Sequence, residues 1–402
     1  MPYQKYTDFL SKSQPTFNLL PAVALGGPPH SGKSVLAYSL TQTLRERGCL
    51  HCLLRAYPPD GEGDWFLTGE QQQVRHFRIK GADSEAWLPL LKRDLARRQL
   101  PLLVDLGGLP TLEQETLLDS CTHAIVLAPD DDTQKAWRAC MQRHGLILLA
   151  DLHSELQGKP RLDAEVPLLR GTLTGLERGT RASGAAYEAL VTRLERLFGY
   201  AAPGLKSHHL RSAPTELVVD LALLAARLGR SAQRWQPGDL QSVLDYLPKG
   251  EPVALYGRGP NWLYAAVAKW ACPAPFFLFD IRLGWVEAPA LDTGEPSPDA
   301  PLRVSAQADA SATKLLFNVP DAYLDILEAA ALRMPPCSAE QGIILSGKLP
   351  QWLWAALVRA CDRKVPWIAV VQPQVHGAVV VHSRVPEVAV GQVISKGLRI
   401  GD

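Results

Sequence analysis

Residues 27–34 read Gly-Pro-Pro-His-Ser-Gly-Lys-Ser, a complete Gly-x-x-x-x-Gly-Lys-[Ser/Thr] loop, which is the pattern of a phosphate-binding loop. An apolar run at residues 22–25 precedes the loop, and apolar residues at helical spacing follow it over residues 33–47, up to Gly48. The motif therefore stands between a predicted strand and a predicted helix, where backbone amides can bind a phosphate. Because such units build parallel sheets covered by helices, no other feature restricts the fold as strongly.

The loop predicts a nucleotide site with a metal ion. Lys33 would reach the β- and γ-phosphates, and the Ser34 hydroxyl would bind Mg²⁺. We expect ATP or GTP with Mg²⁺, and the sequence has no Asn-Lys-x-Asp segment for guanine recognition. The predicted cofactor-binding residues of the loop are Gly27, His30, Ser31, Gly32, Lys33 and Ser34.

Carboxylates follow two further predicted strands. Asp105 ends the apolar segment that begins at residue 101, as expected of the acidic residue that holds the metal together with Ser34. Asp60, Glu62 and Asp64 follow the second strand, and the carboxyl ends of parallel strands face the same crevice. We predict that one of these three is catalytic, as a general base or by orienting a water molecule. A solvated acidic turn remains the alternative.

Strand-like and helix-like segments alternate up to about residue 200, which indicates a P-loop NTPase parallel sheet. We expect this α/β domain at residues 1–202 and a linker containing Pro, Gly and His at residues 203–214. Two small α/β domains would follow at residues 215–298 and 299–402.

Charge and composition exclude several functions. The 402-residue chain has 42 Lys and Arg against 41 Asp and Glu, a net charge of +1, without a long run of one sign. We therefore expect no long nucleic acid and no membrane as partner. The N-terminus lacks an apolar signal core, and no apolar stretch is long enough for a bilayer. These features predict a cytoplasmic protein.

The second half of the chain contains an internal repeat. Residues 257–266, Gly-Arg-Gly-Pro-Asn-Trp-Leu-Tyr-Ala-Ala, return at residues 347–356 as Gly-Lys-Leu-Pro-Gln-Trp-Leu-Trp-Ala-Ala. An apolar strand-like run precedes each copy, and another follows each predicted helix. A strand, basic turn, helix and strand that return in register indicate a duplicated α/β unit.

The turns of the repeat carry its candidate ligand residues. A basic corner between a strand and a helix can bring amides and a cationic side chain to a phosphate. In the first copy, Asp280 and Arg282 lie two residues apart and could bind phosphate or act as an acid–base pair. The predicted substrate-binding residues are Gly257, Arg258, Gly259, Pro260, Gly347 and Lys348.

At this point the chain resembles a known family. Residues 344–353, 367–373, 377–383 and 390–394 look like the ring nuclease of type III CRISPR systems that cleaves cyclic tetra-adenylate. Residues 257–263 and 280–284 look like a divergent second copy, and residues 60–65 and 104–108 are similar to long members with an N-terminal P-loop domain. The resemblance implies a CRISPR-associated Rossmann-like fold for both copies, a cyclic oligoadenylate as partner, a preference for ATP, and a site shared between protomers of a homo-oligomer.

The family's catalytic set is a His near the end of the helix, then an Asp and an Arg in the turn after the next strand. The first copy has Asp280 and Arg282 but places Ala271 or Cys272 at the His position, and the second has Gln372 and Gln374 in the turn. Manganese-dependent cleavage by Asp280 and Arg282 therefore stays an open prediction beside binding alone. The alternative is a small-molecule or nucleotide kinase whose tandem domains only mediate oligomerisation.

Overall fold

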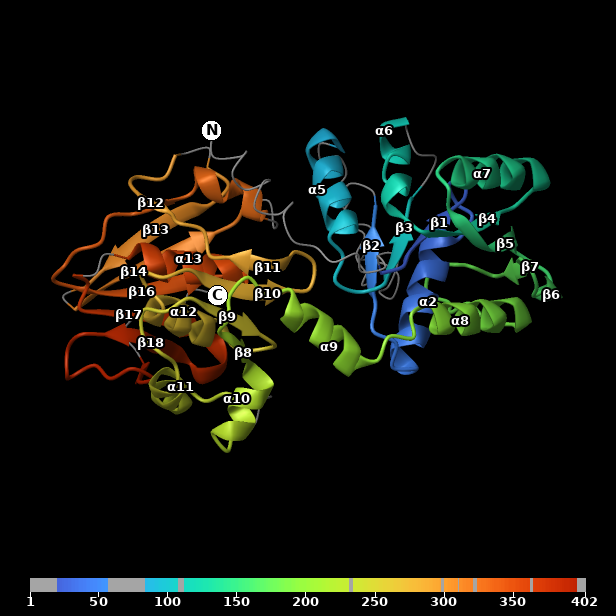
Figure 1. Ribbon diagram of the computed structural model, residues 1–402. Coiled ribbons are helices and arrows are strands. Elements are labelled where there is room, and N and C mark those ends of the chain that lie inside the picture. Colours follow the sequence, from blue (N-terminus) through green and yellow to red (C-terminus); the bar gives the residue numbers. More distant parts are fainter. Residues whose placement is uncertain are drawn as a thin grey trace. The chain divides into compact units, whose positions relative to one another are not determined.

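The computed structural model describes residues 20–56, 84–107, 112–230, 234–297, 300–309, 311–320, 324–361 and 364–395 (Figure 1). The chain divides into two compact units. The first comprises Met1–Ser207 with Ile281–Leu283, and the second comprises His208–Asp280 with Gly284–Asp402.

The first unit, drawn from blue to green in Figure 1, contains a seven-stranded sheet in the order β2-β3-β1-β4-β5-β7-β6. Neighbouring strands are parallel except β6 and β7. The expected mixed α/β fold with a parallel sheet is thus confirmed. The strands are β1 (Ala22–Gly26), β2 (Cys52–Arg55), β3 (Leu102–Asp105), β4 (His123–Ala128), β5 (Ile147–Glu155), β6 (Arg161–Ala164) and β7 (Leu169–Thr174).

Helices cover both faces of this sheet because its central strands are apolar on both sides. On β1, Val23 and Leu25 face a core shared with α2 and α8, whereas Ala22 and Ala24 face a core shared with α5 and α7. The helical segments are α2 (Lys33–Glu46), α5 (Ser84–Ala96), α6 (Leu112–Glu115), η2 (Leu118–Ser120), α7 (Asp131–Arg143) and α8 (Ala185–Leu197).

The boundary between the two units, after Ser207, falls within the expected linker at residues 203–214, but most of this segment is helical, because α9 spans Ala202–Arg211. Pro203 is tolerated there because the N–H groups of the first helical turn have no partner within the helix. In the last turn, the ring of His209 packs 4.4 Å from that of Phe279, and His209 Nδ1 lies 2.9 Å from the Tyr256 hydroxyl. The end of α9 is therefore part of the second unit.

The second unit contains the same strand arrangement twice. One sheet has the order β11-β10-β9-β8, and the larger one has β13-β14-β16-β17-β18-β19. In both, three neighbouring strands are parallel and the next is antiparallel, which makes β8, β9, β10 and β11 the counterparts of β14, β16, β17 and β18. The sequence repeat is thus matched by a repeat of topology.

The described strands of this unit are two to seven residues long. A small parallel pair, β12 with β15, lies outside the two main sheets. The strands are β8 (Val218–Asp220), β9 (Val253–Tyr256), β10 (Phe276–Asp280), β11 (Gly284–Glu287), β12 (Asp292–Thr293), β13 (Arg303–Ala308), β14 (Ala312–Asn318), β15 (Arg333–Met334), β16 (Gly342–Gly347), β17 (Trp367–Gln372), β18 (Gly377–Ser383) and β19 (Val393–Ile394).

The duplicated helices form the centre of the second unit. α12 (Asn261–Trp270) packs against α13 (Gln351–Ala360), and α12 also lies on β17 and β18 of the other copy. Trp262 and Trp354 are almost completely buried in this contact region. The remaining helical segments are α10 (Leu221–Arg227), η3 (Pro237–Asp239), α11 (Leu240–Tyr246), η4 (Ile326–Ala331) and η5 (Pro373–Val375).

Within the described ranges, each helix is too short or too polar to span a lipid bilayer.

Candidate functional site

The loop between β1 and α2 has the backbone shape that its glycines allow. Gly32 precedes α2 in the left-handed region, with φ of 85°, and Gly27 has φ of 156°. A Cβ atom at Gly27 would lie 2.0 Å from the carbonyl oxygen of Leu127, a distance that no side chain tolerates. Glycine is therefore required at this position so that the loop can pass close to the end of β4.

Lys33 is held inside the loop. Its side chain is 5% exposed, and Nζ donates to the carbonyl oxygen of Pro28 at 2.6 Å and to Ser31 Oγ at 3.5 Å. Burial lowers the pKa of Lys33 to about 8, although the Asp105 carboxylate acts in the opposite direction. An anionic ligand would offset this desolvation by stabilising the charged ammonium.

The metal-binding pair predicted from the sequence comes together. β3 is the direct neighbour of β1, with Leu25 opposite Asp105, and Ser34 Oγ donates to Asp105 Oδ2 at 2.8 Å. Asp105 is fully buried, and its Oδ1 accepts a hydrogen bond from the Gly107 amide at 3.2 Å. A hydroxyl and a carboxylate oxygen at this edge are donors that suit Mg²⁺.

The predicted catalytic residues Asp60, Glu62 and Asp64 lie outside the described residues. His30 is exposed in the loop with φ of 64°, and Ser31 is 4% exposed.

No motif in the sequence indicates the polar groups on β5 and at the start of α7. The Ser154 hydroxyl, on β5, donates to the carbonyl oxygen of Ser31 at 2.8 Å. His153 Nε2 lies 3.4 Å from Asp131 Oδ1, and Asp131 begins α7 just after β4. Three consecutive aspartates at residues 130–132 after a buried strand were the available signal, since ligands bind beyond the carboxyl ends of such strands.

The segment after β7 also reaches the phosphate loop. A Cβ atom at Gly32 would lie 2.5 Å from Leu176 Cβ, so the two backbones approach closely there. No sequence motif pointed to this contact, because it depends on β7 taking its place beside β5.

The two corners of the repeat have the same pattern of burial in the second unit. The pattern of buried and exposed positions at residues 253–260 returns unchanged at residues 343–350, with Arg258 and Lys348 exposed in both. Gly257 has φ of 112° and Gly347 has φ of 155°. Pro260 caps α12 as Pro350 caps α13, so each corner leads directly into the N-terminus of its helix.

Hydrogen bonds join the copies at both ends of these helices. At the corners, Gln351 Nε2 donates to the carbonyl oxygen of Gly259 at 3.1 Å. At the other ends, Lys269 Nζ donates to the Cys361 carbonyl oxygen at 2.8 Å, and Arg359 donates to that of Ala268 at 3.0 Å. Such reciprocal contacts are typical of a two-fold interface, here within one chain.

Asp280 and Arg282 lie in the turn between β10 and β11. The parallel register of β9 and β10, with Leu255 opposite Leu278, places Asp280 at the same sheet edge as the first corner. Arg282 is exposed. In the second copy, Gln372 donates to Gln374 at the matching turn, so this turn contributes amides instead of an acid and a base.

Asp220 is a further carboxylate at that edge. It ends β8 opposite Tyr256 and is 8% exposed, and its Oδ1 accepts from the amides of Ala222 and Leu223. The sequence signal was weak, because β8 has only three residues.

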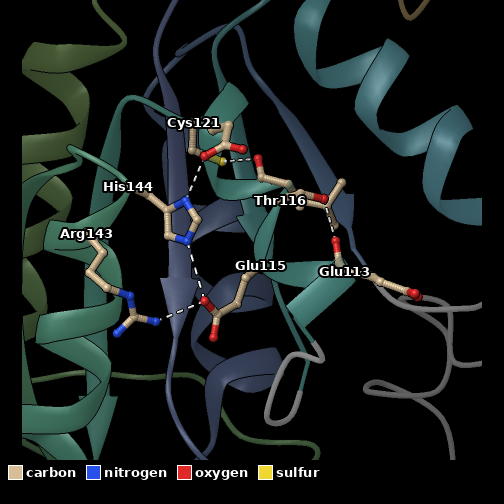
Figure 2. Close-up of polar contacts among 8 residues, drawn as sticks. Glu113, Glu115, Thr116, Cys121, Arg143 and His144 are labelled. Carbon is tan, nitrogen blue, oxygen red and sulfur yellow. Dashed lines mark hydrogen bonds and ion pairs between the residues drawn. The ribbon is translucent and has the colours of Figure 1, made fainter.

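A separate polar cluster ties α6 to α7 (Figure 2). His144 contacts Asp119 at 2.7 Å and Glu115 at 3.5 Å, and Arg143 donates to Glu115 at 2.9 Å. Burial raises the pKa of Glu115, but hydrogen bonds from Arg143 and His144 outweigh it and bring this pKa below its usual value. Ligand atoms of Glu115, Cys140 and His144 lie within 4.8 Å of one another. Because Arg143 already neutralises Glu115, the ion pairs account for this arrangement.

Part of the second unit matches a known protein family. Residues 318–395 match the model of a family described as CRISPR-associated protein (Cas_csx3), which supports a CRISPR-associated protein. The match covers the second copy from the end of β14 to β19. The curated proteins include no match to this sequence. Among solved structures, chloroplast FtsY from Physcomitrella patens matches with a TM-score of 0.26 and 10% identity, over 46% of this chain and 68% of that chain, a similarity too low to define a fold.

Proposed function

We propose that the first unit binds ATP with Mg²⁺ at the phosphate loop. The contact between Ser34 Oγ and Asp105 Oδ2 carries this proposal, because it joins the end of the loop to the acidic strand through the oxygen atoms that Mg²⁺ prefers. Lys33 supports it, since a buried lysine with a lowered pKa gains most from a polyphosphate partner.

The chain's own groups supply binding and charge stabilisation. Lys33 would leave the Pro28 carbonyl and hold the terminal phosphate, and the amides around Gly32 would donate to the phosphate oxygens. A bound Mg²⁺ would neutralise phosphate charge. The pair of His153, on β5, and Asp131, at the start of α7, is a further candidate to orient a water molecule or an acceptor hydroxyl, in addition to the predicted catalytic residues at 60–64.

The nucleotide site is tested by titration calorimetry with ATP and Mg²⁺. Loss of a charge-assisted phosphate contact costs about 2–3 kcal/mol, so Lys33→Ala should weaken binding roughly thirty- to a hundredfold. Lys135→Ala, at an exposed lysine on α7, should bind as the parent does. Equal affinity of Lys33→Ala and the parent would refute the assignment.

We further propose that the paired corners of the second unit bind a cyclic oligoadenylate, with the tetra-adenylate as first candidate. The CRISPR-associated match supports this, together with the repeated corners that Gln351 joins to one another. A pair of similar cradles suits a ligand with rotational symmetry, because equivalent phosphates can meet equivalent turns.

Titration of labelled cyclic tetra-adenylate tests this second site. Exposed charge contacts contribute about 1 kcal/mol or less, so Arg258→Ala and Lys348→Ala should each weaken binding by up to roughly fivefold. Chromatography after incubation with Mn²⁺ or Mg²⁺ then shows whether the ring is cleaved. Linear products that Asp280→Ala abolishes would establish a nuclease, and binding without products would establish a sensor. Absence of micromolar binding, with both corner variants equal to the parent, would refute the site.

The nucleotide domain would then be an ATPase or a phosphoryl-transfer enzyme whose activity responds to the bound cyclic oligoadenylate. A regulatory module whose ATP occupancy only sets the state of the second unit is the competing function, and a kinase with tandem oligomerisation domains is another. Phosphate release or transfer, measured with and without cyclic tetra-adenylate, separates these three.

A further inference from the structure

The second unit contains a cavity of about 600 Å³ at the C-terminal ends of α12 and α13. Its walls come from both copies of the repeat, and its apolar part includes Pro273, Pro289 and Leu291. The corners lie at the opposite ends of the same helices. Because ten helical residues span about 15 Å, this cavity and the corners are separate places in the fold.

Basic side chains form a large part of the lining of this cavity. The described lining residues include no carboxylate. The charge of Arg359 acts to lower the pKa of Glu287, but burial of Glu287 outweighs this and raises that pKa above its usual value. The basic lining residues are Lys249, Lys269, Arg359, Lys364, His382 and Arg384.

The fold holds two of these cations in place. Lys269 is 9% exposed and donates to the Cys361 carbonyl oxygen, and Arg359 donates to the carbonyl oxygens of Ala268 and Ala274. Lys249 Nζ lies 5.0 Å from the centre of the Trp270 ring. Fixed cations of this kind form a preorganised positive surface, which lowers the cost of binding an anion.

The pKa of His382 reflects the positive charges around the cavity. Burial lowers its pKa to about 4, and the charges of Lys269, Lys249 and Arg384 act in the same direction. Close cations disfavour any further positive charge and favour a negative one.

We propose that this cavity binds a small phosphorylated molecule. Several convergent Lys and Arg side chains are the usual partners of phosphate groups, while the proline and leucine walls fit an organic portion. The volume lies within the range of small-molecule sites. Because the lining combines both copies, an occupant would tie their helix ends together and stabilise the unit.

Titration calorimetry with inorganic pyrophosphate tests the cavity in the full chain carrying Lys33→Ala, which weakens the phosphate loop. The triple change Lys249→Gln, Lys364→Gln and Arg384→Gln removes exposed cavity charges, and we expect it to weaken pyrophosphate binding at least about tenfold. The change Arg234→Gln with Arg303→Gln removes exposed charges outside the lining and should leave binding unchanged.

The corner site and the cavity site are distinguished by testing the variants of each site with both probes, cyclic tetra-adenylate and pyrophosphate. Arg258→Ala with Lys348→Ala should weaken cyclic tetra-adenylate and spare pyrophosphate, whereas the cavity triple variant should do the reverse. A corner variant that loses pyrophosphate as strongly as the cavity variant would overturn the proposal, without bearing on the ring site.

A second measurement does not depend on the folding of the variants. In the chain carrying Lys33→Ala alone, bound pyrophosphate should raise the pKa of His382, followed by NMR of its ring protons. An unchanged His382 titration at saturating pyrophosphate, or no saturable binding at millimolar concentration, would overturn the cavity site.

Discussion

The phosphate loop and the two corners of the repeat share a strand–turn–helix arrangement but differ in how deeply their basic side chains are buried. Each places a glycine-rich basic turn between a strand and a helix, but Lys33 is 5% exposed whereas Arg258 and Lys348 are exposed. The loop encloses its lysine next to Ser34 and Asp105, as a small ligand with concentrated charge requires. The corners leave their charges at the surface, which suits a larger ligand that spreads its phosphates over both copies.

The difference is largest at the glycines. A Cβ atom at Gly27 would overlap the Leu127 carbonyl oxygen, whereas a Cβ atom at Gly257 would meet nothing nearer than 3.5 Å. Gly27→Ala should therefore distort the loop and weaken ATP binding by more than about a hundredfold, on the order of 3 kcal/mol.

The matched change Gly257→Ala should leave ATP affinity unchanged and cost about 1 kcal/mol of stability, because only its positive φ is strained. Calorimetry and thermal unfolding of both variants give the comparison. Equal ATP affinity of Gly27→Ala and Gly257→Ala would remove the distinction between an enclosed loop and an open corner.

The second expected difference concerns pH. Only charged Lys33 holds phosphate well, and its pKa is about 8, so ATP affinity should fall as pH rises above 8, by at most about tenfold per pH unit. Binding near this pH should take up a proton, which calorimetry in buffers of different ionisation enthalpy measures. Lys33→Arg stays charged and should show a flat profile.

The same pKa fixes the sign of the effect of Lys33 on stability. Because the folded-state pKa is lowered from 10.5 to about 8, the unfolded chain binds more protons between these values, and the contribution of Lys33 to stability rises with pH across this window. The affinity of the exposed corners for cyclic oligoadenylate should not change with pH near 8 in this way.

Local sequence patterns predicted the parts of the site that depend on neighbours in the chain. The strand, loop and helix around residues 22–46 follow from apolar periodicity and two glycines, and β3 brings Asp105 to Ser34 as the motif implies. The duplicated corners were visible because their spacing is constant.

Local sequence patterns do not predict the tertiary contacts of the site. Ser154 and Leu176 approach the loop only because β5 and β7 extend the sheet on that side. Pro203 and Gly204 are typical of turns and do not indicate α9, yet both stand in its first turn, where they are tolerated. The basic cavity joins residues from positions 249 to 384 that share no motif.

The most direct test of the account is the metal dependence of ATP binding, measured by calorimetry with Mg²⁺ and with a chelator. Ser34→Ala and Asp105→Asn remove one oxygen ligand or one charge from the pair and change the shape of the site little. The account predicts that Mg²⁺ tightens ATP binding in the parent and in Lys135→Ala, and that this gain largely disappears in both site variants. A gain from Mg²⁺ that is as large in Ser34→Ala and Asp105→Asn as in the parent would contradict it.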